Sequence, residues 1–290
     1  MLYFKMAEIG FCVDDNDNKI PAGEYLRLFQ TDSREYESLN DRVKIVVQWS
    51  RPEELHEIQD KGSYAVCRYK DNIVVATHYG RCRYGILFKI DDWARGEILL
   101  QINPEISRKD FTLNQLLSMS GIHSAFINNN TVTLHASYIQ TPEGAILFTA
   151  PSQTGKSTQA ELWEHYTGAE IINGDRVLIR KQDSQWFAHG ISVCGSSKIC
   201  KNRKCLIRAI VVLEQGKQNT VLDLTQGEKY RALLLASAIY NWDAGQVDKV
   251  TQLIMQIIEN VRIVKLVCRP DKDAVTTLKT YLNEVEENDC

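Results

Sequence analysis

The first hundred residues alternate short apolar runs with polar turn signals. The runs are rich in β-branched and aromatic residues, which is the pattern of half-buried strands. Asp71-Asn72 lies between two of them and indicates a tight turn. The pattern predicts a small, mainly antiparallel sheet made of residues 43–49, 64–70, 73–79, 84–90 and 96–102.

The pattern changes near Pro104, where helical spacing first appears. Thr112 can cap a helix that places Leu113, Leu116 and Leu117 on one face and ends at 128–130. Strands and helices alternate from there onward, as in an α/β domain. The predicted strands are 131–139, 145–149, 169–173, 176–181, 206–214 and 262–268, and the predicted helices are 156–166, 228–240, 246–260 and 271–282.

Two parts are therefore expected, a β-rich region at 1–106 and an α/β domain at 107–290. The 290 residues, 44% hydrophobic and 24% charged, have an ordinary globular composition. A net charge of −3 argues against nucleic-acid binding through a broadly basic surface. The N-terminus lacks signal-peptide features, and no apolar run approaches the roughly 20 residues that cross a bilayer. We expect a cytoplasmic protein without nucleic-acid or membrane partners, and the oligomeric state stays open.

Eight cysteines occur without a C-x-x-C pair, and in the cytoplasm free thiols are expected. The closest group, Cys194, Cys200 and Cys205, has only His189 nearby and makes a poor zinc pattern.

The stretch Ala150–Ser157, APSQTGKS, nearly matches the phosphate-binding loop G-x-x-x-x-G-K-[ST] (the Walker A pattern). It follows a predicted strand and opens a predicted helix, where backbone N–H groups and the helix dipole favour an anion. Ala150 replaces the first glycine, which lies farther from the phosphates than Gly155, so we expect it to be tolerated. A chance G-K-S in an ordinary turn is the alternative. The predicted nucleotide-binding residues are Ser152, Gln153, Thr154, Gly155, Lys156, Ser157 and Thr158.

Within that loop, Lys156 is expected to reach the β- and γ-phosphates and Ser157 to bind Mg²⁺. Asp175 ends the apolar strand after the loop helix, where a carboxylate binds the metal or orients a nucleophile. The alternative is that Gly174-Asp175 forms a hairpin turn. His135 lies on the strand before the loop strand and can pair with Asp175, although a lone strand histidine is also compatible with a core position.

The order and spacing of Leu134-His-Ala-Ser137, the loop and the Asp-ended strand resemble the HPr kinase/phosphorylase family, which has a phosphoenolpyruvate carboxykinase-like P-loop fold. The resemblance covers residues 107–290. It implies an ATP- and Mg²⁺-dependent kinase acting on a hydroxyl. Asp175, His135 and Lys156 would be the catalytic residues, and Ser157 and Asp175 the metal ligands.

Two departures from the family pattern matter. The family's Asp-Asp pair reads Gly174-Asp175 here, so either Asp175 serves both as metal ligand and base or another residue assists. The signature of HPr recognition is absent, so HPr is not the expected substrate. The chain is more similar to HPr-kinase-like proteins found beside peptide-modification systems, some of which phosphorylate a serine of a precursor peptide.

The expected acceptor is therefore a Ser or Thr of a peptide or protein. A small-molecule kinase is one alternative. A non-catalytic nucleotide-binding regulatory module is another, with its β-rich region holding a partner. The basic segment 196–208 contains Lys198 and Arg203, which could contact phosphate or an acidic peptide or simply form a solvated face, and Arg208, expected to be structural.

Overall fold

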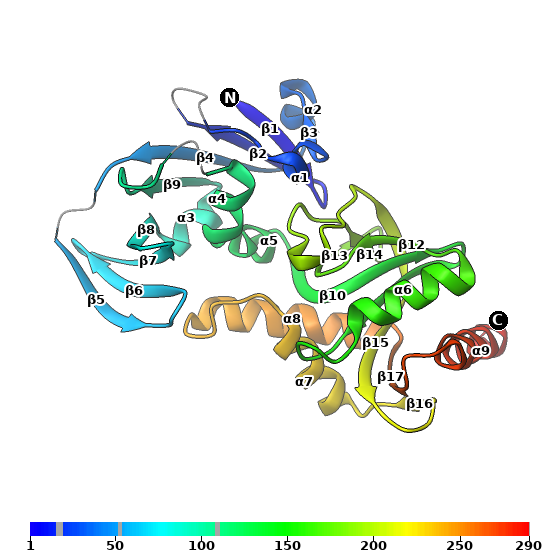
Figure 1. Ribbon diagram of the computed structural model, residues 1–290. Helices are drawn as coiled ribbons and strands as arrows, with labels where there is room; N and C mark the ends of the chain where they lie inside the picture. Colours follow the sequence, from blue (N-terminus) through cyan, green and yellow to red (C-terminus); the bar gives the residue numbers. More distant parts are fainter. Residues whose placement is uncertain (16–19, 52–53, 108–110, 290) are drawn as a thin grey trace. The chain divides into compact units, whose positions relative to one another are not determined.

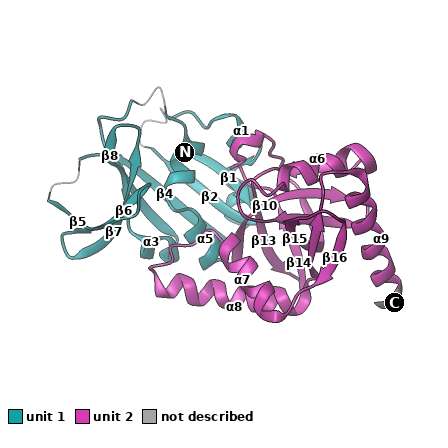
Figure 2. Cartoon of the chain, turned by 60° about the horizontal axis from the view of Figure 1, so that its bottom comes forward, with its two compact units in different colours: residues 1–129 teal, residues 130–290 magenta. Residues whose placement is uncertain are grey.

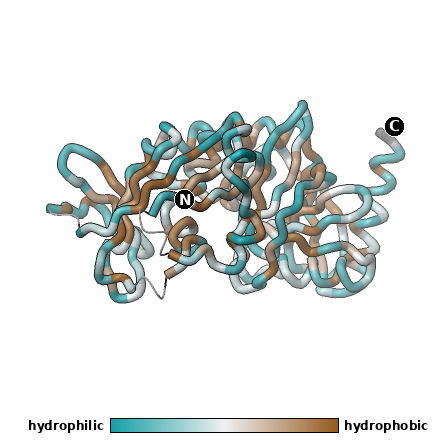
Figure 3. Tube along the Cα trace, turned by 90° about the horizontal axis from the view of Figure 1, so that it is seen from above, coloured by the Kyte–Doolittle hydropathy of each residue, from teal (hydrophilic) through white to brown (hydrophobic). Residues whose placement is uncertain are grey.

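The computed structural model describes residues 1–15, 20–51, 54–107 and 111–289, so Cys290 lies outside the described residues. The chain forms two compact units, residues 1–129 and 130–290 (Figure 2). Each unit has its own sheet and its own helices. Figure 3 shows hydrophobic and hydrophilic stretches alternating along the chain.

Unit 1 contains a mixed sheet with the strand order β3-β1-β2-β4-β9-β8-β7-β6-β5 (Figure 1). All five predicted strands are present, and the sheet is mainly antiparallel as expected, with parallel pairing only of β2 with β4 and of β4 with β9 among the described strands. Tyr69 pairs with Asn72, so the tight turn is Lys70-Asp71, one residue earlier than predicted. The strands are β1 Leu2–Met6, β2 Ile9–Asp14, β3 Gln30–Thr31, β4 Asp41–Trp49, β5 Leu55–Asp60, β6 Tyr64–Tyr69, β7 Asn72–Tyr79, β8 Cys82–Phe88 and β9 Glu97–Ile102.

The helices of unit 1 are α1 Glu24–Arg27, α2 Ser33–Ser38, α3 Ile90–Arg95, α4 Leu113–Met119 and α5 His123–Asn128. Thr112 caps α4 as predicted, because its hydroxyl accepts the Gln115 N–H at 3.2 Å. The single helix predicted from there is divided, since Gly121 adopts a φ of 71°. The Trp93 indole donates to the Ser120 carbonyl at 3.1 Å and holds α3 against this segment. The boundary between units therefore follows α5, rather than lying at 106/107.

Unit 2 contains a second mixed sheet together with four longer helices. Every strand and helix predicted beyond residue 130 is present, whereas β14 and β16 were not predicted. The strands are β10 Thr131–Thr141, β11 Gly144–Thr149, β12 Glu170–Asn173, β13 Arg176–Gln182, β14 Gln185–His189, β15 Lys204–Gln215, β16 Thr220–Asp223 and β17 Ile263–Cys268. The helices are α6 Lys156–Thr167, α7 Gln226–Ala236, α8 Ala244–Asn260 and α9 Lys272–Asp289, with a 3₁₀ turn at Gly195–Ser197.

Five strands of unit 2 close into a ring. β11 pairs antiparallel with β10 and parallel with β15, and β13 and β14 connect the other edges of those two strands. β15 also pairs parallel with β17, so β11, β15 and β17 form a parallel group. Ligands of α/β sheets bind beyond the carboxyl ends of parallel strands, and the loop 150–155 leaves β11 at such an end.

The core beside this parallel group contains Phe148, Trp163 and Leu278, which come from β11, α6 and α9. The rings of Phe148 and Trp163 lie 6.3 Å apart and fix α6 on the sheet. The structural role predicted for Arg208 is confirmed. Its side chain is 2% exposed, and its Nε lies 2.7 Å from Oε1 of Glu286 on α9.

Within the described residues, no helix combines the length and apolar character needed to cross a membrane. No disulfide joins the seven cysteines that the structure describes. In the same ranges, no three His, Cys, Asp or Glu side chains come together as ligands for a metal ion.

Candidate functional site

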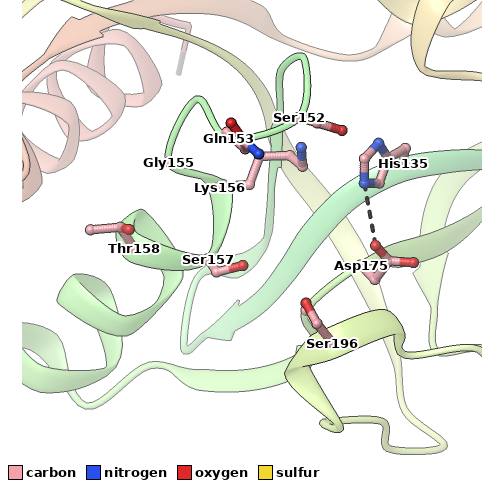
Figure 4. A pocket seen from close by; sticks show the side chains of 10 residues that line it. His135, Ser152, Gln153, Gly155, Lys156, Ser157, Thr158, Asp175 and Ser196 are labelled. Atoms are coloured by element: carbon pink, nitrogen blue, oxygen red, sulfur yellow. Dashed lines mark ion pairs between the residues drawn. The ribbon is translucent and has the colours of Figure 1, made fainter.

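A cavity of about 390 Å³ lies in unit 2 where the loop 150–155 joins β11 to α6. Six of the seven residues predicted to bind nucleotide line it, and Thr154 does not. Both His135 and Asp175 line the same cavity (Figure 4). The full set is His135, Ser152, Gln153, Gly155, Lys156, Ser157, Thr158, Gly174, Asp175 and Ser196.

Gly155 is the residue immediately before α6 and adopts a φ of 113°, which L side chains rarely adopt. A Cβ at this position would meet no atom of the described residues within 4 Å. The backbone conformation, rather than crowding, therefore requires glycine here. No side chain caps the N-terminus of α6, and the first N–H groups of a helix have no acceptor within it. These donors border the cavity and form a site suited to an anion.

Ala150 does not have a positive φ, so alanine is unstrained where the loop pattern has glycine. Its carbonyl accepts a hydrogen bond from the Lys156 ammonium at 3.0 Å, and the Pro151 carbonyl accepts another at 3.3 Å. Lys156 is buried, and burial lowers the pKa of its ammonium while the charge of Asp175 opposes that shift. The Lys156 side chain thus folds back onto the loop that precedes it.

His135 and Asp175 are brought together as the sequence predicts. Nε2 of His135 lies 3.3 Å from Oδ1 of Asp175 (Figure 4), and Nε of Arg176 lies 3.5 Å from Oδ2. Burial lowers the pKa of His135, the nearby Lys156 charge lowers it further, and Asp175 opposes both. The imidazole is therefore neutral at pH 7 and can donate one N–H to the carboxylate.

The hairpin alternative for Gly174-Asp175 is wrong. β12 and β13 both pair antiparallel with β10, so they run in the same direction and form one interrupted strand. Tyr138 pairs with Asn173 and His135 with Arg176 on either side of the interruption. The Ala136 N–H still donates to the Asp175 carbonyl at 3.0 Å, so the backbone remains in register. Asp175 therefore lies opposite the strand that carries His135.

Asn173, which is not among the predicted site residues, holds this interruption in place. Its side chain is fully buried. Oδ1 accepts the N–H groups of Asp175 and Arg176, both at 2.9 Å. Nδ2 donates to the carbonyls of Ile191 at 2.9 Å and Val193 at 3.0 Å. The signal was the Asn-Gly pair before Asp175, because asparagine side chains commonly bond the backbone two residues ahead.

Residue 174 is a glycine for a steric reason. A Cβ at Gly174 would lie 2.4 Å from both Cβ and Oγ of Ser197, in the 3₁₀ turn. A Cβ at Gly195, whose φ is 55°, would lie 2.7 Å from the carboxyl carbon of Asp175. The turn therefore packs directly on residues 174 and 175, with no space for an acidic side chain at 174. Asp175 is the sole carboxylate among the described residues that line the cavity.

The basic segment does not enter this cavity in the way the sequence suggested. Neither Lys198 nor Arg203 belongs to the described cavity lining. Lys201 pairs with Glu170 at 3.0 Å, and the Lys204 ammonium lies 4.3 Å from the centre of the Phe187 ring. A direct role for Lys198 or Arg203 stays a prediction.

Comparison with known families finds no family model that matches, and no curated protein matches the chain. Among solved structures, 54 chains match. One is the Hpr(Ser) kinase/phosphatase from Coxiella burnetii, with 13% sequence identity and a TM-score of 0.33. The match covers 54% of this chain and 94% of that one. The structural likeness is distant.

Proposed function

We propose that this protein transfers the γ-phosphoryl group of ATP to a hydroxyl, with a Ser or Thr of a peptide or protein as the acceptor. One observation carries the proposal. A single cavity brings together a phosphate-type loop at an uncapped helix N-terminus and the His135–Asp175 pair. Phosphoryl transfer depends on these two elements, since catalysis consists mainly of positioning and charge stabilisation.

The residues present fit a nucleotide. The Cβ position of Gly155 is open, so backbone can approach a phosphate closely, and the N–H groups of the first turn of α6 border the same cavity. They also fit Mg²⁺, which usually keeps several waters and takes one or two protein carboxylates besides substrate phosphates. Asp175 and the Ser157 hydroxyl are the protein ligands that the cavity offers. The bound ion would neutralise charge on the phosphates.

Each residue then has a separate task. Lys156 exchanges the carbonyls of Ala150 and Pro151 for phosphate oxygens and stabilises their charge. The Asp175 carboxylate holds and aligns the acceptor hydroxyl and receives its proton. His135 donates an N–H to Asp175 and fixes the direction of that carboxylate, with Arg176 on its other oxygen.

The experiment separates binding from transfer. Lys156→Ala should reduce ATP affinity about 10- to 100-fold, since a hydrogen bond to a charged group contributes about 1.5–3 kcal/mol. Asp175→Asn should retain ATP binding within about threefold yet lose transfer of labelled phosphate to a serine and threonine peptide library, because a general base contributes about 10²–10⁴-fold. Titration calorimetry and peptide labelling measure the two effects.

Lys217→Ala and Asp183→Asn are matched controls, since both residues are exposed and lie outside the cavity lining. Both should behave as the native protein. Undiminished transfer by Asp175→Asn would remove the assigned base. Labelling confined to the low-molecular-weight fraction of a cell extract would indicate a small-molecule acceptor instead.

A regulatory nucleotide-binding module is the second candidate, and the single carboxylate of the cavity favours it. Such a protein would bind ATP and Mg²⁺ through the same loop without transferring phosphate. It would be supported if calorimetry shows native ATP binding while neither peptides nor cell-extract fractions become labelled.

A further inference from the structure

One hydroxyl of the chain itself lies in the cavity beside the assigned base. Ser196 belongs to the 3₁₀ turn at 195–197, and it lines the cavity together with Asp175 and Lys156. In Figure 4 it lies on the Asp175 side of the cavity, across from the loop. Its side chain is exposed, and its hydroxyl has no hydrogen-bond partner among the described residues.

The neighbouring serine differs in each of these respects. The Ser197 hydroxyl donates to the Cys194 carbonyl at 2.7 Å and accepts the Ile199 N–H at 3.3 Å. These bonds hold the turn closed. Ser197 does not line the cavity in the described part of the chain. Ser197 is therefore a structural residue, whereas the Ser196 hydroxyl is available for reaction.

The turn is also fixed against the base. A Cβ at Gly195 would lie 2.7 Å from the carboxyl carbon and 2.8 Å from Oδ1 of Asp175, so the backbone before Ser196 packs against that carboxylate. The position beside Asp175 is where an acceptor hydroxyl must lie for attack on the γ-phosphate. Ser196 is thus held near the acceptor position by the fold itself.

We propose that Ser196 is phosphorylated by its own chain, so that the protein is a self-modifying kinase. This inference rests on the proposed function. Oγ of Ser196 forms a bond to the γ-phosphorus of ATP. The bond from that phosphorus to the β–γ bridging oxygen breaks, and ADP leaves with the electron pair. The hydroxyl proton passes to the Asp175 carboxylate, so the products are phosphoserine 196, ADP and one proton.

The modification limits further turnover. A phosphoserine carries about −1.5 to −2 charges at pH 7. Here it would stand beside the Asp175 carboxylate and in the cavity that receives the nucleotide phosphates. Like charges in one site repel, so the phosphorylated protein should bind ATP more weakly, by about tenfold or more. The kinase would thereby be restrained by its own first product.

The test incubates the full-length protein with ATP and Mg²⁺ and no added acceptor. Intact mass spectrometry should show the gain of one phosphate, and fragmentation should place it on Ser196 rather than Ser197. The rate per molecule should stay constant over a tenfold dilution, because the reaction is intramolecular. Ser196→Ala should lose the phosphate, Ser196→Thr should regain it because a hydroxyl is restored, and Ser63→Ala, at an exposed serine of unit 1, should retain it.

The outcomes separate this inference from the proposed function. If the peptide library is labelled while the protein mass stays unchanged, or if phosphate is found on another residue, self-phosphorylation at Ser196 is overturned and the kinase function stands. A rate that rises in proportion to protein concentration overturns the intramolecular reaction. If the native protein neither binds ATP nor forms ADP, both proposals fail.

Discussion

At the scale of single residues, His135 is held in its neutral form. Burial lowers the pKa of its imidazole, and the charge of Lys156 adds to this effect. As pH falls below about 6.5, the ordinary value, the unfolded chain takes up the proton first. His135 therefore leaves folding stability unchanged above that pH. As pH falls toward the lowered pKa of the folded state, the free energy of unfolding decreases.

His135→Gln tests this directly. Between pH 7 and pH 5, in buffer containing a chelator, the native protein should lose more thermal stability than the variant, because only the native protein carries the titrating imidazole. Thermal unfolding followed by circular dichroism measures both curves. Parallel curves would show that the environment of His135 does not disfavour its charged form. The side chain is 40% exposed, so solvent weakens the effect.

Asn173 supplies the second prediction at this scale. Asn173→Ala should lower the free energy of unfolding by about 2–4 kcal/mol, since each buried group left without a partner costs about 1–3 kcal/mol. Its four hydrogen bonds orient the backbone at Asp175, so phosphoryl transfer should fall more than ATP affinity does. Urea unfolding and calorimetry measure these quantities.

Asn173→Asp separates the two roles of this side chain, because it retains an oxygen for the N–H groups of Asp175 and Arg176 but loses the donor to Ile191 and Val193. It should destabilise the protein at least as much as the alanine substitution does, because its buried carboxylate would face two carbonyl oxygens. If Asn173→Ala were as stable as the native protein, the assigned role of this side chain would be refuted.

At the scale of elements, the sequence predicts strands and helices better than it predicts their pairing. β11, the loop 150–155 and α6 could be predicted because an apolar run, a loop pattern and a helical spacing follow one another directly in the sequence. The sequence does not distinguish the interrupted strand formed by β12 and β13 from a hairpin, because Asn-Gly-Asp is a turn signal in both arrangements. Its pairing with β10 depends on contacts distant in sequence.

The packing of the 3₁₀ turn on that strand could not be predicted from the sequence either. The sequence alone does not show that Ser197 fills the space beside Gly174. The glycine is explained by an element twenty or so residues later in the chain, which folds back onto it. The positions of His135 and Asp175, in contrast, could be predicted because they lie at matching points of two neighbouring strands.

Placing a carboxylate at position 174 tests this packing. Gly174→Asp should destabilise the protein by about 1–3 kcal/mol, the usual cost of overpacking. Combination with Ser197→Gly, which removes the opposing side chain, should recover part of that loss, with an interaction energy of about 1 kcal/mol or more. Urea unfolding of the four proteins completes the cycle. Strictly additive effects would show that the two positions do not compete for space.

At the scale of the whole molecule, the candidate site belongs to one unit. Every described residue that lines the cavity lies between His135 and Ser196, within unit 2. That unit also has its own core, in which Trp163 and Phe148 pack between α6 and the sheet. The loop pattern found in the sequence therefore belongs to unit 2, and no described residue of unit 1 lines the cavity.

Residues 130–290 produced alone should fold and bind ATP within about threefold of the full chain, since a domain with its own core folds independently. Circular dichroism and calorimetry measure folding and binding. If peptide labelling falls while ATP binding is retained, unit 1 contributes to acceptor recognition. A fragment that does not fold would mean that the two units are one cooperative structure.

The turned-in position of Lys156 has a consequence for the speed of the proposed cycle. Because the carbonyls of Ala150 and Pro151 already accept its hydrogen bonds, they compete with phosphate for the same ammonium. When ADP departs, the lysine can return to these two oxygens instead of losing a partner to solvent. In the proposed cycle, this internal competition lowers the affinity for ADP and shortens its residence time. The loop that binds the nucleotide would then also help to release it.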